Sequence, residues 1–161
     1  MTLRKRMILM RRFWLAVSAL SMALMGAVTT LAAAAPADEA NAVVDAWVAR
    51  YSANDRDGVV ALYAPDAILL GTTSPVISEG TEQIRTYFDE LPGSGRSNRI
   101  TDRRTRVLSP DAVLSTGFYA FARAAEGNVP RPSRFSMLLV RRDGRWLILH
   151  HHSSPHSAVR R

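Results

Sequence analysis

Residues 141–154 read RRDGRWLILHHHSS, a turn signal followed by an apolar run that ends in three histidines. Asp143-Gly144 between two extended runs predicts a tight β-hairpin, because a two-residue turn of this kind needs positive φ angles. Side chains of a strand alternate between its faces, so we expect one face to carry Trp146, Ile148, His150 and His152. His151 is then expected on the opposite face, beside Leu147 and Leu149. A serine- and proline-containing segment follows the histidines, so we interpret them as native and not as an affinity tag.

The segments before this hairpin begin with helices. Residues 37–53 predict an amphipathic helix, because a single helical stripe is formed by Ala40, Val44, Trp47 and Tyr51. Asn54-Asp55 ends this helix and can cap a short second one that runs to residue 63. Helical spacing returns over residues 81–91, so three helices are expected in the first half of the domain.

The remaining segments predict strands. A short strand is expected at 67–70, and turn signals separate four longer candidates at 97–108, 112–124, 134–142 and 145–153. This order predicts an α+β domain in which a curved antiparallel sheet packs on the three N-terminal helices. The concave side of such a sheet must be filled by helix or by ligand, so a pocket is expected there.

Residues 1–34 have the organisation of a secretory signal peptide. Five basic residues precede an apolar run, and small residues surround the expected cleavage after Ala34. Two alternatives stay open: Arg11-Arg12 permits twin-arginine export, and an uncleaved run from Phe13 to Ala35 is nearly long enough to span a bilayer. Cleavage would leave one domain, residues 35–161, in the periplasm or outside the cell, without stable membrane insertion.

Charge and composition exclude several classes of function for the mature domain. The leader holds five of the 21 basic residues and no acidic residue, so the rest of the chain has 16 arginines against 14 acidic residues. This net charge of +2 does not favour nucleic-acid binding. The chain lacks cysteine, and its one lysine is Lys5, which excludes a thiolate nucleophile, a Schiff base and a lysine-dependent phosphate-binding loop in the mature domain.

Several short motifs in a fixed order carry a family resemblance over residues 38–154. They are LYAPDA at 62–67, IRTYF at 84–88, TGFYAF at 116–121, SRFS at 133–136, and DGRWLI at 143–148 with HHHSS at 150–154. With these motifs the chain resembles the nuclear transport factor 2-like, or SnoaL-like, superfamily. Within it the chain is similar to the SgcJ/EcaC group, related to the association domain of calcium/calmodulin-dependent protein kinase II. The resemblance implies a cone-shaped fold with a pocket, but not one reaction, because the superfamily hosts isomerases, cyclases, dehydratases and non-catalytic proteins.

The candidate site residues come from the strand faces and from the helical stripe. His150 and His152 are the candidate catalytic groups, although metal ligation or ordinary hydrogen-bonded burial stay open for them, and no metal or cofactor is expected. The candidate ligand-binding residues are Arg134, Tyr119, Trp47, Tyr51 and Asp102. A buried Arg134 would need an anion, either Asp102 or a bound carboxylate.

Two classes of function follow. The first is an exported domain that binds a small anionic or carbonyl ligand and forms a homodimer. The dimer is expected through the outer sheet face, where alternation would expose Met137, Leu139, Leu147 and Leu149. The second class is a cofactor-independent lyase, isomerase or cyclase that uses His150 or His152 as its base.

Overall fold

The long helix that the aromatic stripe predicts is α2, Pro36–Ser52, in the computed structural model, which describes residues 35–156. Proline at the start of α2, Asp38 and Glu39 in its first turn and Arg50 in its last turn all favour a helix at these positions. Ala40, Val44, Trp47 and Tyr51 are all buried, so the predicted stripe is confirmed. The predicted signal peptide, residues 1–34, lies outside the described residues.

Two shorter helices follow. Asp55 caps α3, Arg56–Val60, by accepting a hydrogen bond of 2.8 Å from the Gly58 backbone N–H. The third helix, α4, covers Gly80–Tyr87 and buries Ile84. Over residues 35–156, no helix is long and apolar enough to cross a membrane.

Six strands form one curved sheet in the order β2-β1-β6-β5-β4-β3. Their bounds are Tyr63–Leu70 (β1), Ile77–Glu79 (β2), Arg96–Ser109 (β3), Ala112–Arg123 (β4), Arg131–Arg142 (β5) and Arg145–Pro155 (β6), with a 3₁₀ turn at Ala124–Glu126. The four long strands β3 to β6 pair antiparallel, as predicted. β1, however, pairs parallel with β6, so the sheet is not antiparallel throughout. β1 joins β6 from a distant part of the chain, and no hairpin connection imposes an antiparallel pairing on it.

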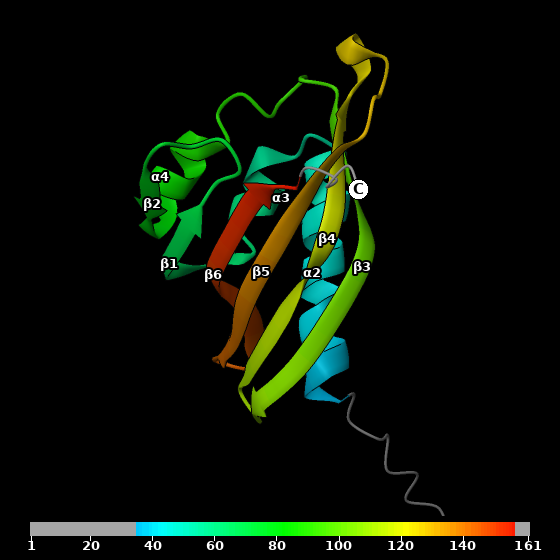
Figure 1. Ribbon diagram of the computed structural model, residues 1–161. Coiled ribbons are helices and arrows are strands. Elements are labelled where there is room, and N and C mark those ends of the chain that lie inside the picture. The colour runs from blue at the N-terminus through cyan, green and yellow to red at the C-terminus, as the bar shows by residue number, and fades with distance from the viewer. Residues whose placement is uncertain (1–34, 157–161) are drawn as a thin grey trace, which may run out of the picture. The chain divides into compact units, whose positions relative to one another are not determined.

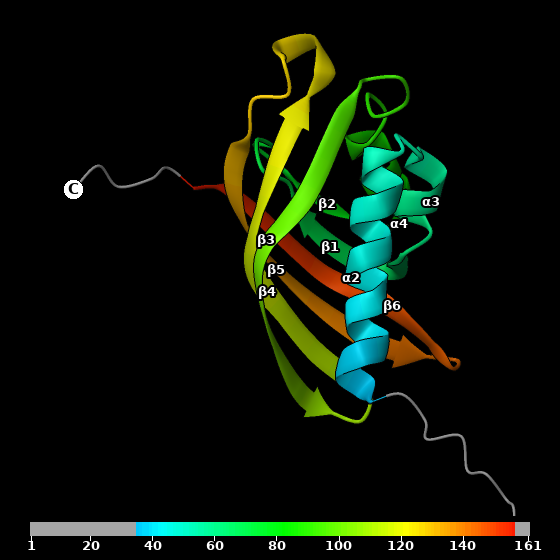
Figure 2. The ribbon, with the colours of Figure 1, turned by 90° about the vertical axis from the view of Figure 1, so that its right-hand side faces the viewer.

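The sheet curves around α2, which lies against its concave side (Figures 1 and 2). The core fills the space between them, and its larger members include Trp47, Tyr119, Phe135, Met137, Leu139 and Ile148. Met137 and Leu139 are therefore core residues, and their predicted place on the outer face is wrong. In β5 the odd-numbered residues from 133 to 139 are buried against the core, so the even-numbered residues between them face outward.

The predicted hairpin is confirmed, but the strand after it contains a β-bulge. Asp143 and Gly144 have φ angles of 51° and 74°, as a two-residue turn of this type requires. The pairing of β6 with β5 then shifts from Leu139↔Ile148 to Leu138↔His150, so Leu149 is skipped. A skipped residue reverses the alternation of all later side chains. Trp146 and Ile148 face the core before the bulge, and His151 and Ser153 face it afterwards.

Candidate functional site

A cavity of about 410 Å³ opens between α2, α4 and the concave side of the sheet. Its inner part is lined by side chains that are almost fully buried, among them Trp47, Leu69, Tyr119, Ser133, His151 and Ser153. Its mouth carries the more exposed charged residues Glu90, Arg96, Arg123, Glu126 and Arg131. The cavity is therefore lined by aromatic, aliphatic and uncharged polar side chains inside, and it is charged at its opening.

Stacked aromatic rings form one wall of this cavity. Trp47 stacks on Tyr51 with ring centroids 5.1 Å apart, and on Tyr119 at 6.3 Å. Tyr119 in turn stacks on Phe135 at 5.0 Å. Such pairs stabilise a fold by about 0.5–1.5 kcal/mol beyond the area that they bury, so stacking helps to hold the wall in place. Three of the residues predicted to bind ligand, Trp47, Tyr51 and Tyr119, line the cavity.

His150 and His152 lie on the outer face of the sheet, so their predicted place in the cone is wrong. The bulge at Leu149 turns both of them outward and turns His151 inward, where it is 1% exposed and lines the cavity. The strand pattern alone assigned His151 to the outer face, because a period of two assumes an unbroken ladder. Burial lowers the pKa of His150, and the neighbouring charge of His152 acts in the same direction.

Asp102 and Arg134 also lie on the outer face and not in the cone. A second bulge, between Ile100 and Asp102, turns the Asp102 carboxylate outward, where it pairs with Arg104. Arg134 is exposed on the outward phase of β5, and its Nη2 lies 3.1 Å from Nδ1 of His156. The predicted pairing of Arg134 with Asp102 or with a ligand in the cone is therefore wrong.

Each ring nitrogen of His151 faces a phenol group. The Trp47 indole N–H donates to the Tyr63 hydroxyl at 2.9 Å, and this hydroxyl lies 2.8 Å from Nδ1 of His151. The other nitrogen, Nε2, lies 3.5 Å from the Tyr119 hydroxyl. Four buried polar groups from α2, β1, β4 and β6 thus form one chain of contacts at the inner end of the cavity.

These buried groups are uncharged at neutral pH. Burial lowers the pKa of His151 to about 3, and the neighbouring charges of His150 and His152 act in the same direction. Burial raises the pKa of the Tyr63 phenol well above its usual range. It also raises the pKa of Tyr119, and the nearby Ser153 hydroxyl partly offsets this rise. The inner end of the cavity therefore offers neutral hydrogen-bonding groups and no charge.

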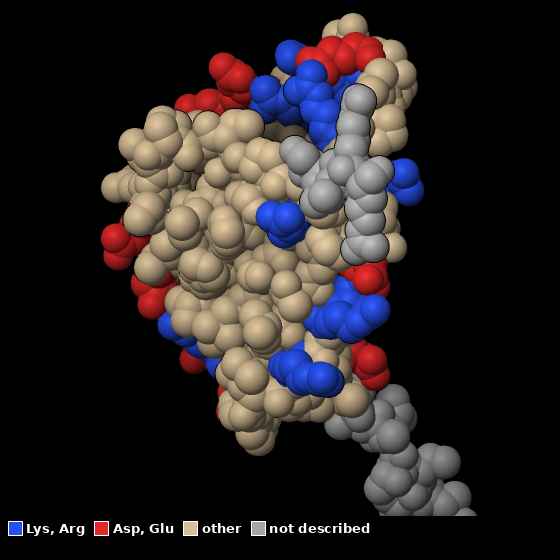
Figure 3. All heavy atoms as spheres, viewed as in Figure 1, with Lys and Arg blue, Asp and Glu red and all other residues tan. Residues whose placement is uncertain are grey.

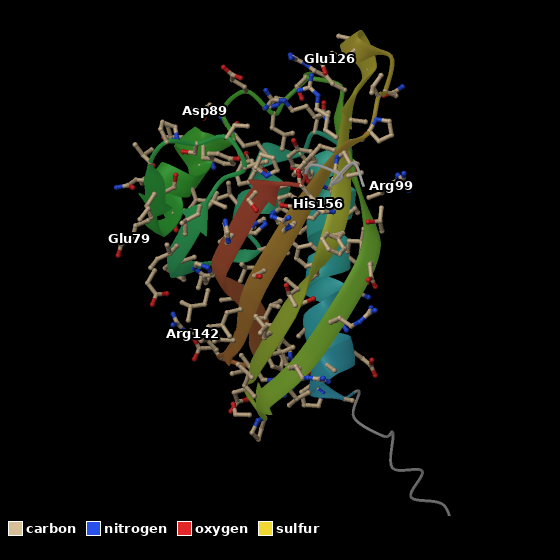
Figure 4. All side chains as sticks on the ribbon, in the orientation of Figure 1. Glu79, Asp89, Arg99, Glu126, Arg142 and His156 are labelled. Atoms are coloured by element: carbon tan, nitrogen blue, oxygen red, sulfur yellow. The ribbon has the colours of Figure 1, made fainter. Side chains whose placement is uncertain are left out.

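The mouth of the cavity has an excess of positive charge. Of the described residues that line the cavity, three are arginines and two are glutamates. Arg96 pairs with Glu90 at 3.1 Å, and Glu126 contacts Arg131 at 2.6 Å and Arg123 at 3.9 Å. Figure 4 shows Glu126 at the end of the domain opposite Arg142, and Figure 3 shows charged side chains gathered at that end.

Arg96 and Arg123 stand directly opposite each other on β3 and β4. Like charges at facing positions of a sheet repel each other, and Glu90 and Glu126 offset part of this repulsion. Burial raises the pKa of the nearby Tyr51 phenol to about 12, and the charges of Arg96 and Arg123 partly offset this rise. Sequence reasoning missed these arginines, because they come from separate strand ends whose register it did not resolve.

No group of three or more His, Cys, Asp or Glu side chains within residues 35–156 is arranged to hold a metal ion. The prediction of a cofactor-free site stays a prediction.

Comparison with known proteins places the fold in a large group. A protein from Xanthomonas campestris, assigned to the calcium/calmodulin dependent protein kinase II association domain, is 32% identical, with a TM-score of 0.67 over 74% of this chain and 86% of that one. A ketosteroid isomerase-like protein from Erwinia carotovora atroseptica is 17% identical, with a TM-score of 0.63 over 78% and 100% of the two chains. A Streptomyces avermitilis protein of the NTF2-like family, assigned as a dehydratase, is 15% identical, with a TM-score of 0.67 over 76% and 96%.

A comparison with curated proteins gave no match. The SnoaL-like domain, in contrast, matches residues 40–158, which include α2 from its fifth residue onward, the two other helices, the six strands and all residues that line the cavity. The resemblance in the sequence motifs is therefore confirmed, and the chain belongs to the SnoaL-like domain family and has the nuclear transport factor 2-like fold.

Proposed function

We propose that this domain binds a small amphipathic anion, with its apolar ring in the aromatic cavity and its carboxylate at the arginines of the mouth. The observation that carries this proposal is the facing pair Arg96 and Arg123 at the opening of an aromatic cavity. A bound carboxylate would relieve the repulsion between these two guanidinium groups and would accept charge-assisted hydrogen bonds from them.

The size of the cavity and the character of its walls support the same ligand class. Its volume of about 410 Å³ lies within the range of about 300–1,000 Å³ that is usual for small-molecule sites. The inner walls are aromatic and hold no charged side chain among the described lining residues that are buried. A ligand with one or two rings can therefore bury its apolar part while its charged group stays at the mouth.

Calorimetry with 2-naphthoate and its neutral amide tests the proposal. We expect the carboxylate to bind more tightly than the amide, since only the carboxylate carries the charge that the arginines attract. Arg123→Ala should weaken naphthoate binding by about 1.5–3 kcal/mol, the usual value of a hydrogen bond to a charged group. Arg134→Ala is the matched control, because Arg134 lies on the outer face, beside His156. Equal affinity for acid and amide, or equal losses in both variants, would contradict the proposal.

The alternative function is a cofactor-independent lyase, isomerase or cyclase. His151 replaces His150 and His152 as the imidazole in the cavity, but its pKa of about 3 makes it a weak base. Of the two carboxylates that line the cavity, Glu90 and Glu126, both pair with arginines at the mouth. Binding without catalysis is therefore the function that we propose.

We propose in addition that residues 1–34 direct export and are removed after Ala34, as their three-part pattern indicates. The intact mass of protein isolated from its native host tests this. A species that keeps the leader and stays in the membrane would contradict it.

We also propose a homodimer through the outer face of the sheet. This face is largely uncharged over β4, β5 and β6 (Figure 3), and it carries Leu114, Phe118 and Leu138. Apolar patches of this kind mark interaction surfaces. Light scattering should give the mass of a dimer for the wild type and of a monomer for Leu138→Arg. A monomeric wild type at micromolar concentration would contradict the proposal.

A further inference from the structure

The position of the proton on His151 follows from the hydrogen bonds around Tyr63. The Trp47 indole nitrogen can only donate, so the Tyr63 oxygen accepts its hydrogen bond. The phenol then still has its own proton to donate. Of the described residues, the further partner of this hydroxyl is Nδ1 of His151, at 2.8 Å. Nδ1 therefore accepts a hydrogen bond from the Tyr63 hydroxyl, and a neutral His151 carries its own proton on Nε2.

The nitrogen that carries the proton is the one on the cavity side. Tyr119, which faces Nε2, lines the cavity, whereas Tyr63 lies behind His151 and outside the cavity lining. The distance of 3.5 Å from Nε2 to the Tyr119 oxygen is long for a hydrogen bond, so this donor is only weakly engaged. A ligand atom that accepts hydrogen bonds can therefore approach it.

We infer that Trp47 and Tyr63 hold His151 as the Nε2–H tautomer, and that the inner end of the cavity thereby selects ligands whose buried end is a hydrogen-bond acceptor, such as a carbonyl oxygen. The ligand part of this inference rests on the proposed function and makes it more specific: a ring that carries a carboxylate at one end and a carbonyl at the other. Tyr63 is a positioning residue in this arrangement, since it acts on the ligand through His151.

The hydroxyl groups near Tyr119 support this assignment. Thr72 and Ser153 form a hydrogen bond with each other, and both line the cavity beside Tyr119. Hydroxyl groups rotate and can turn their protons toward an acceptor, whereas the proton on Nε2 is fixed by the ring. A carbonyl oxygen at this end would then meet donors from β4 and β6 together.

The tautomer can be measured without any ligand. Long-range proton–nitrogen correlation NMR on protein labelled with nitrogen-15 in its histidines distinguishes the two neutral forms. Burial lowers the pKa of His151 to about 3, so this imidazole should stay neutral as the pH falls from 7 to 5, and its signals are identified by their absence in His151→Gln. We expect the Nε2–H form alone, and a signal from the Nδ1–H form would overturn the inference. In Tyr63→Phe we expect both forms to appear. A pure Nε2–H signal in this variant would overturn the positioning role of Tyr63.

Two probes of nearly equal shape test the ligand part. 4-Acetylbenzoate and 4-isopropenylbenzoate share the ring and the carboxylate, but only the first has a carbonyl oxygen. We expect the wild type to prefer the ketone by about tenfold, the value of one hydrogen bond. The preference should disappear in His151→Leu, which keeps a similar volume without the donor. Equal affinity of the wild type for both probes would overturn the acceptor preference and leave carboxylate binding intact. Binding of neither probe would overturn this ligand part together with the proposed function, while the tautomer result stands separately.

Discussion

The two faces of the sheet place the same residue types in opposite environments. Phe135 on the inner face is 2% exposed and stacks on Tyr119, whereas Phe118 on the outer face is 39% exposed and stacks on His156. His151 is buried, and its neighbour His152 is exposed. The difference shows that the phase of a strand decides whether a side chain is a core group or a surface group. Substitutions on the two faces test this contrast.

The two phenylalanines should differ most in what they contribute to stability. Phe135→Ala removes a fully packed ring and leaves a cavity, so we expect it to lower the free energy of unfolding by about 3–5 kcal/mol. Phe118→Ala removes a ring that is partly in water, and we expect a loss below about 1 kcal/mol in the monomer. Urea unfolding of both variants measures the difference.

A loss in Phe118→Ala as large as that in Phe135→Ala would break the contrast between the faces. If the loss in Phe118→Ala grows with protein concentration, the outer face is covered by a second copy, which would support the proposed dimer.

The buried histidine should make stability depend on pH. Its pKa is about 3 in the folded protein and about 6.5 in the unfolded chain, so below pH 6.5 the unfolded state binds the extra proton. The stabilisation that comes from keeping His151 neutral is therefore fully present above pH 6.5, and it is lost as the pH falls below that value. We expect a loss of about 2 kcal/mol between pH 8 and pH 5, measured by urea unfolding at several pH values.

His151→Gln is the control for this pH dependence, since it cannot titrate and should flatten the curve over the same range. The lowered pKa of His150 acts in the same direction, so a small slope should remain in this variant. Asp55 and Asp66 also have lowered pKa values, but the stabilisation from their ionised carboxylates is lost only in solution more acidic than the range from pH 8 to pH 5. An unchanged slope in His151→Gln would mean that His151 titrates normally in the folded protein.

The smallest effect is expected at Arg134. Its guanidinium is exposed and contacts His156 near the end of the described chain. Arg134→Ala should therefore change the free energy of unfolding by no more than about 0.5 kcal/mol, as is usual for surface substitutions. Thermal unfolding of this variant checks the value, and a loss above about 1 kcal/mol would show that Arg134 supports the fold.

Much of the fold could be predicted from the sequence, because its local signals agree with its tertiary packing. The stripe on α2, the turn at Asp143-Gly144 and the order of the long strands are examples. β2 and the parallel pairing of β1 with β6 could not be predicted, since β2 has only three residues and β1 pairs with a strand that is distant in the sequence.

The candidate site could be predicted only in part, because two bulges change the phase of the strands. The stripe on α2 placed Trp47 and Tyr51 correctly, since a helix keeps its period without interruption. His150, His152 and Asp102 were placed wrongly, because each follows a skipped residue, Leu149 or Thr101. A bulge depends on the pairing with the neighbouring strand, and alternation within one strand does not reveal it.

The bulge at Leu149 gives the three consecutive histidines a further meaning. A slip of the last strand by one residue would exchange the inward and outward side chains after the bulge, which normally ruins a binding site. Here such a slip in either direction would replace His151 by His150 or by His152, so an imidazole would still enter the cavity. The repeat makes this position tolerant of register errors. An insertion or deletion near the bulge would keep an imidazole in the cavity, although it would disturb the packing of the neighbouring side chains.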